Sequence, residues 1–219
     1  PRSTLFPYTT LFRSEVARAA AKHGGVYASH MRDEGAQVME AIAEAAEVGA
    51  ATGMRVQLSH FKIDNRKLWG SSVKTLALVE DYRRKGVDVV VDQYPYDRSS
   101  TNLGITLPTW ALADGAKAVK ERLASPQTRR RIAAEMKQML EDKGLKDYEY
   151  AMVGSYAKDR SIEGKTIAEI VRGRGKQGTV DEQIELIFEV IGEGGAQMVY
   201  HSMGERSEER RVGKECRSR

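Results

Sequence analysis

Apolar and polar positions follow two different periods along the first half of the chain, and they predict strands separated by helices. Short apolar runs at 26–31, 54–62 and 87–96 are typical of strands. Between them, residues 35–49 and 71–86 carry apolar side chains at helical spacing. These helical positions are Val38, Ile42 and Ala45 in the first segment and Val73, Leu76 and Val79 in the second. Strands that alternate with helices indicate an α/β fold with a parallel sheet.

Polar residues stand at the end of each predicted strand. His30 ends the first strand, His60 ends the second, and Asp92 and Tyr94 end the third. The spacing of about thirty residues corresponds to one strand, one helix and two loops of a (β/α)8 barrel. Because active sites of such barrels gather at the carboxyl ends of the strands, these polar residues are candidates for chemistry.

Two of these residues, His30 and His60, are the candidate metal ligands. Side chains alternate along a strand, so His60 and Lys62 should share the face of Val56 and Leu58 and point toward the barrel mouth. Neighbouring strands lie about 4.8 Å apart, which brings two strand-end imidazoles close enough to bind one ion, and neutral imidazole suits zinc. The alternative is that each histidine is a buried or capping residue that donates a hydrogen bond.

The two ends of the chain, 1–14 and 206–219, are related through their codons. When residues at equal distances from the two ends are paired, every pair can be encoded by reverse-complementary codons, as CCG for Pro1 and CGG for Arg219. One oligonucleotide joined to both ends of a DNA fragment produces this relation. Both flanks therefore resemble a translated sequencing adapter and are excluded from fold reasoning. The natural segment is expected to span 15–205.

Excluding the flanks changes the charge and the cysteine content. The formal net charge of the whole chain is +4, of which the flanks contribute +5, so the remaining segment carries −1. The basic footprint expected for a partner such as nucleic acid or an anionic membrane is absent from the segment. The one cysteine, Cys216, lies in a flank, which excludes a disulfide framework from the segment. No apolar run approaches the roughly 18–20 residues of a membrane span. These features leave the location of the protein unknown, with a cytoplasmic location favoured.

The stretch 101–197 interrupts the thirty-residue rhythm. Helical spacing recurs at 115–123, 127–142 and 180–191, and a strand-like segment lies at 148–157. Because the stretch is too long for a loop, we expect it to form a unit of its own.

Several motifs, in this order and spacing, resemble the N-acyl-D-amino-acid deacylases (D-aminoacylases) of the zinc-dependent amidohydrolase superfamily. These motifs are YASHMRDEG, VQLSHFKI, DQYPYDRSST followed by LPTW, and MVYHSM. The resemblance implies a partial (β/α)8 TIM-type barrel, about strands 5 to 7, at 15–100. It further implies a large helical insertion after strand 7 at 101–197, used as a lid over the acyl pocket, and a return toward the barrel at 198–205. Side chains that line the pocket on this view, or otherwise belong to the core, are Leu107, Trp110 and Leu112.

The resemblance also implies roles for five residues. His30 and His60 match the zinc ligands, and the residues that match the contacts of the substrate carboxylate are Lys62, Tyr94 and Ser100. The chemistry agrees, because amide hydrolysis needs a Lewis acid that activates water and polarises the carbonyl. An ammonium and hydroxyl donors can hold a free carboxylate. The expected partner is a small-molecule N-acyl-D-amino acid, with no nucleic acid or membrane partner.

Part of the family's site has no match between 15 and 205. The His-x-His pair, the cysteine ligand and the catalytic aspartate are expected outside this segment, so the isolated chain should be inactive and bind zinc poorly. His201 matches the family without an assigned role. The alternatives are a cyclic-amide hydrolase of the hydantoinase or dihydroorotase type and a non-catalytic, barrel-derived binding module. The spacing of Lys62, Tyr94 and Ser100 favours the deacylases.

Overall fold

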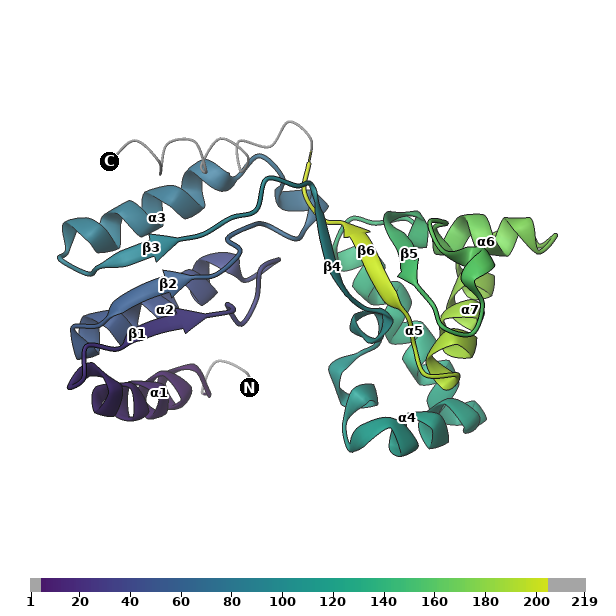
Figure 1. The fold of residues 1–219 in the computed structure, drawn as a ribbon, viewed down its shortest axis with the longest axis horizontal. Helices are drawn as coiled ribbons and strands as arrows, with labels where there is room; N and C mark the ends of the chain where they lie inside the picture. The colour runs from purple at the N-terminus through teal and green to yellow at the C-terminus, as the bar shows by residue number, and fades with distance from the viewer. Residues whose placement is uncertain (1–4, 205–219) are drawn as a thin grey trace. The chain divides into compact units, whose positions relative to one another are not determined.

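The structure, a computed structural model, describes residues 5–204 (Figure 1). The first helix, α1 (Leu5–Ala21), runs across the position where the N-terminal flank is predicted to end. The flank predicted at 206–219 and residues 1–4 of the other flank lie outside the described residues. Among the residues described, no helix is both long and apolar enough to cross a membrane. The chain divides into two compact units.

The N-terminal unit is built on a parallel sheet of three strands. It comprises the described residues up to Tyr96, together with Met203 and Gly204. Its strands are β1 (Val26–Ser29), β2 (Arg55–Leu58) and β3 (Val89–Val91), in the order β1-β2-β3. Ser29 pairs with Leu58 in the register, so the carboxyl ends of β1 and β2 lie at the same edge. All three predicted strands and their parallel arrangement are confirmed.

Helices α2 (Val38–Thr52) and α3 (Ser72–Arg84) connect these strands and bury one face of the sheet. Ile42 of α2 and Val56 of β2 are fully buried in the same core. The close approach of α2 to β2 requires a glycine at position 49, since a Cβ there would lie 2.5 Å from a methyl carbon of Val56. Figure 1 shows the helices running along the strands they connect.

The predicted apolar face of α3 is partly wrong. Val73 is 58% exposed, whereas Ser72, Thr75 and Val79 are buried. These three residues follow helical spacing and form the stripe that meets the core, and Val73 lies about 100° around the helix from Ser72. The short polar side chains of the stripe allow close packing but carry little apolar signal in the sequence.

The second unit, Asp97–Ser202, is an antiparallel sheet covered by helices. Its strands are β4 (Arg98–Asn102), β5 (Ala151–Ser155) and β6 (Gln197–His201), in the order β4-β6-β5. Its helices are α4 (Gly115–Ala124), α5 (Pro126–Asp142), α6 (Ile167–Gly173) and α7 (Val180–Gly192). It also contains four short 3-10 helices, η2 (Leu103–Thr106), η3 (Thr109–Leu112), η4 (Tyr148–Tyr150) and η5 (Arg160–Ile162). The three helices and the strand predicted from the sequence are all present.

The limits of the second unit differ from the sequence-based limits of 101 and 197 by a few residues. The reason is that β4 and β6 pair with each other over their full lengths, from Arg98 with His201 to Asn102 with Gln197. Both ends of the segment therefore belong to one sheet, which a helical period count cannot detect. The core of this unit gathers apolar residues of α5, α7 and the sheet, including Met136, Phe188 and Met198.

Candidate metal centre

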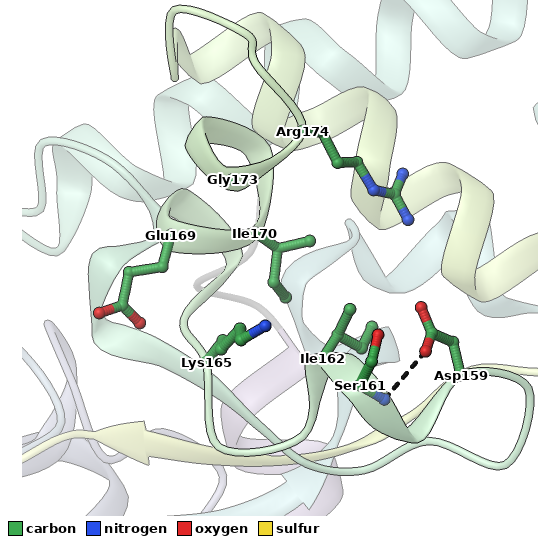
Figure 2. Close-up of a pocket in the computed structure, with 8 residues that line it drawn as sticks. All are labelled: Asp159, Ser161, Ile162, Lys165, Glu169, Ile170, Gly173 and Arg174. Atoms are coloured by element: carbon green, nitrogen blue, oxygen red, sulfur yellow. Dashed lines mark hydrogen bonds between the residues drawn. The ribbon is translucent and has the colours of Figure 1, made fainter.

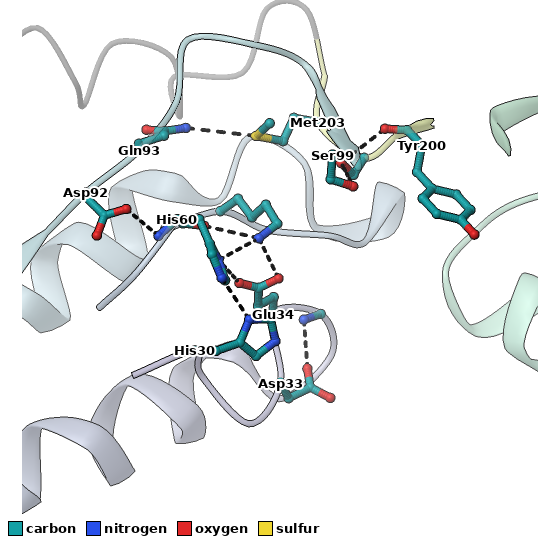
Figure 3. A network of polar contacts seen from close by, with 12 residues as sticks. His30, Asp33, Glu34, His60, Asp92, Gln93, Ser99, Tyr200 and Met203 are labelled. Atoms are coloured by element: carbon teal, nitrogen blue, oxygen red, sulfur yellow. Dashed lines mark hydrogen bonds and ion pairs between the residues drawn. The ribbon is translucent and has the colours of Figure 1, made fainter. Parts of the chain in front are cut away.

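The two candidate histidines meet at the carboxyl edge of the parallel sheet. His30 directly follows β1, and His60 comes two residues after the end of β2. Nδ1 of His30 lies 2.8 Å from Nε2 of His60, and the ring centroids are 4.6 Å apart. Figure 3 shows the two rings directed at each other. The structure thus brings together the pair that the sequence predicts.

The route by which His60 reaches this position differs from the prediction. Val56 and Leu58 are fully buried on the helix side of the sheet, so continued alternation would place His60 in the core. Instead, β2 ends at Leu58, and His60 adopts a left-handed backbone conformation with φ 41°. The Asp92 carboxylate holds the turn, because it accepts the His60 N–H at 2.7 Å and the Gln57 amide at 2.5 Å. A turn, rather than strand parity, directs His60 to the site.

Glu34 joins the histidines, although it is not among the site residues predicted from the sequence. Among the described residues, His30, Glu34 and His60 form a group whose potential ligand atoms all lie within 4.8 Å of one another. Oε1 of Glu34 lies 2.7 Å from Nδ1 of His60. The only sequence signal was an acidic pair after the first histidine. Its other member, Asp33, instead accepts hydrogen bonds from two backbone N–H groups of its own loop.

Lys62 lies beside this group and is almost completely buried. Its side chain is 7% exposed, and Nζ forms an ion pair with Oε2 of Glu34 at 2.6 Å. Nζ also donates to Nδ1 of His60 at 2.9 Å and to the carbonyl oxygen of His60 at 3.2 Å. The predicted carboxylate-binding cation is therefore held at the histidine pair by Glu34.

Tyr94 completes the part of the predicted set that lies in the N-terminal unit. Its ring centroid is 6.0 Å from Nζ of Lys62. Within the described part of the chain, its buried hydroxyl has no hydrogen-bond partner. Burial, with a smaller contribution from the charge of Glu34, raises the pKa of Tyr94 to about 12. The hydroxyl is consequently a protonated, unused donor at neutral pH.

Ser100, the fifth predicted residue, belongs to the second unit. It lies on β4, and its hydroxyl donates to the carbonyl oxygen of Met198 at 3.0 Å. In the same unit, Nε2 of His201 lies 3.5 Å from a carboxylate oxygen of Asp97. The first contact joins β4 to β6, and the second joins β6 to the residue before β4.

The residues considered for an acyl pocket have different environments. Leu107 is buried in the core of the second unit, and Trp110 donates its indole N–H to Glu135 at 2.7 Å. Leu112 is 36% exposed. A pocket of about 460 Å³ in this unit is lined by eight other residues, including Lys165 and Arg174 (Figure 2). None of the predicted site residues lines it.

Comparison with known proteins finds relatives that match part of the chain. The chain is 46% identical over 88 residues to N-acyl-D-glutamate deacylase of Alcaligenes xylosoxydans xylosoxydans and 38% identical over 104 residues to D-aminoacylase of the same organism. The relatives of this chain are N-acyl-D-amino-acid deacylases. The matches cover 40% and 44% of the chain but only 18% and 21% of these two deacylases. No protein-family model matches the chain.

Solved structures of deacylases share the fold. The crystal structure of N-acyl-D-glutamate deacylase from Bordetella bronchiseptica, complexed with zinc and a phosphonate mimic of the tetrahedral intermediate, matches 91% of the chain with a TM-score of 0.60 and 24% identity. A D-aminoacylase structure with a binuclear metal centre matches 90% with a TM-score of 0.57 and 26% identity. The chain spans 32% of each solved deacylase.

Proposed function

We propose that the chain is part of a metal-dependent amidohydrolase that hydrolyses the amide bond of N-acyl-D-amino acids, which yields a carboxylate and a free D-amino acid. The observation that carries this proposal is the cluster at the carboxyl edge of the sheet. Nδ1 of His30 lies 2.8 Å from Nε2 of His60, and Nζ of Lys62 lies 2.9 Å from Nδ1 of His60. The similarity to the deacylases supports the same reaction.

Zinc fits the residues that are present. Nδ1 of His30 and Nε2 of His60 converge, and neutral imidazole nitrogen is a preferred zinc donor. When bound, zinc lowers the pKa of a bound water and polarises the substrate carbonyl. His30 and His60 would hold the ion, and the His-x-His pair, the cysteine ligand and the catalytic aspartate would come from the larger protein.

Lys62 and Tyr94 supply the recognition of the substrate carboxylate in this proposal. The buried ammonium provides the charge, and a charge-assisted hydrogen bond to a carboxylate is stronger than a neutral one. The buried Tyr94 hydroxyl is a donor that lacks a partner within the described chain, as expected for a group that serves a ligand. Ser100 is the third proposed contact. An anchored carboxylate restricts the orientation of the substrate and thereby places its amide for attack.

The fold of the N-terminal unit is consistent with part of an amidohydrolase barrel. We assign β1, β2 and β3 to about strands 5 to 7 of a (β/α)8 barrel, because parallel strands connected by helices are its building unit. The second unit corresponds in sequence order to the insertion after strand 7. A barrel of this kind places His30 and His60 at the catalytic face.

Zinc binding by the purified chain tests the metal site. We expect weak binding, measured by competition with a chromogenic chelator, and its loss in His30→Ala and in His60→Ala. His23→Ala is the matched control, since His23 is an exposed histidine of the same unit. Unchanged zinc affinity in both site variants would contradict the proposed centre.

An amidase assay tests the expected incompleteness of the active site. The zinc-loaded chain should not turn over N-acetyl-D-methionine at enzyme-like rates, because two histidines cannot close a site that normally has three or more ligands and water. Turnover at such rates would show that the described residues suffice. The sequence of the complete gene gives the second check, through a His-x-His motif upstream and an aspartate-ended strand downstream.

A further inference from the structure

The two ring nitrogens of His60 face different partners. Nε2 faces Nδ1 of His30 at 2.8 Å. Nδ1 lies 2.7 Å from Oε1 of Glu34 and 2.9 Å from Nζ of Lys62. Figure 3 shows the Glu34 carboxylate beside the His60 ring and close to His30. A cation held between the histidines would therefore use Nε2, and Glu34 would contact the opposite nitrogen.

Lys62 and Glu34 both contact Nδ1 of His60, but Lys62 needs a lone pair on this nitrogen and Glu34 needs a proton on it. An ammonium can only donate, so the contact from Lys62 requires a lone pair on Nδ1 and places the ring proton on Nε2. Oε1 of Glu34 lies 2.7 Å from the same nitrogen and has no hydrogen-bond partner among the described residues. In the tautomer with the ring proton on Nε2, Glu34 is a buried acceptor beside a nitrogen that carries no proton.

We propose that Glu34 is a positioning residue that couples metal binding at His60 to the availability of Lys62. This inference rests on the proposed function. A cation on Nε2 needs the lone pair of that nitrogen, so the ring proton moves from Nε2 to Nδ1, with no net gain or loss of protons. Oε1 of Glu34 accepts the new Nδ1–H. Lys62 can no longer donate to Nδ1, and its Nζ stays paired with Oε2 while it turns one donor toward the substrate carboxylate.

Both oxygens of Glu34 are needed for this coupling. Oε1 would accept the Nδ1–H of His60, and Oε2 pairs with Nζ of Lys62. The side chains of Glu34 and Lys62 are only 12% and 7% exposed. Water is therefore a poor substitute for either contact. A carboxylate on the non-ligating nitrogen of a metal-bound histidine fixes its tautomer and raises its basicity.

Nitrogen-15 NMR of the full chain tests the tautomer directly. Long-range proton–nitrogen spectra identify which ring nitrogen of His60 carries the proton. We expect the proton on Nε2 without added metal and on Nδ1 after zinc is added. Zinc binding through Nδ1 would overturn the proposal, since Glu34 would then share the ion as a direct ligand.

Variants test the coupling separately. Glu34→Ala should weaken zinc binding about 10- to 100-fold, the usual effect of losing the partner of a ligating histidine. Glu34→Gln should weaken it less, because its carbonyl oxygen can still accept from Nδ1. Glu40→Gln, an exposed position on α2, removes the same charge and should leave affinity unchanged.

Different results would contradict the proposed metal centre and the proposed role of Glu34. If His30→Ala and His60→Ala abolish zinc binding but Glu34→Ala stays within twofold of the parent chain, the positioning role is wrong and the metal centre stands. If the histidine variants bind zinc as the parent does, the metal centre is wrong and the role of Glu34 falls with it. Should Glu34→Ala not fold, the NMR measurement on the parent chain decides.

Discussion

Replacing Lys62 with methionine should destabilise the N-terminal unit by leaving Glu34 without its cation. The two side chains form a 2.6 Å ion pair with 7% and 12% exposure. Removal of one partner from a buried pair costs about 3–5 kcal/mol, because the other charge stays desolvated. Glu34 keeps some access to water, so we expect a loss near the lower end, about 3 kcal/mol.

Urea unfolding followed by tryptophan fluorescence measures this loss. The chain has two tryptophans, Trp69 in the N-terminal unit and Trp110 in the second. In a Trp110→Phe background, the emission of Trp69 reports only the unit that contains Lys62. Lys67→Met is the matched control, since this exposed lysine should change stability by no more than about 0.5 kcal/mol.

A double variant isolates the interaction. Lys62→Met combined with Glu34→Leu removes both charges, and replacing a buried ion pair by apolar groups is often nearly neutral. The double variant should therefore be more stable than Lys62→Met alone. A loss below about 1 kcal/mol for Lys62→Met, or strictly additive effects in the double variant, would refute the view that these groups form one buried unit.

Three further measurements address packing, capping and ionisation. Gly49→Ala should destabilise the N-terminal unit by about 1–3 kcal/mol in urea, because the added Cβ would lie 2.5 Å from a methyl carbon of Val56; an unchanged midpoint would contradict the close contact. Thr179→Ala should cost the second unit about 1 kcal/mol, since it removes the capping box that Thr179 forms with Glu182 at the start of α7, and Thr179→Ser should retain most of the stability. Tyr94, whose pKa is about 12, should ionise about two units above an ordinary tyrosine. The stability contributed by the protonated Tyr94 side chain is present below pH 10 and is lost as the pH rises from 10 to 12. The difference between the ultraviolet titrations of the parent chain and Tyr94→Phe gives the pKa of Tyr94, and an ordinary value near 10 would contradict the prediction.

The sequence determined the element order and most of the site by short-range signals. Strand-like runs ended in polar residues at regular intervals, and that pattern was enough to place His30 and His60 together, because parallel strands present their carboxyl ends at one edge. The helices α5 and α7 were equally legible from their apolar spacing, and their buried residues include Met136 and Phe188. The family resemblance gave Lys62, Tyr94 and Ser100 their proposed role at the substrate carboxylate.

Tertiary structure decided the features that depend on contacts between distant residues. The direction of His60 is set by a turn that is held by Asp92, the residue after β3, and local alternation along β2 could not predict this contact. Glu34 looked like any loop carboxylate until the fold brought it against His60 and Lys62. Periodicity reports which side chains a single element buries. The partners that meet at the end of a sheet are fixed only when the strands pair, because their separation along the chain leaves no local trace.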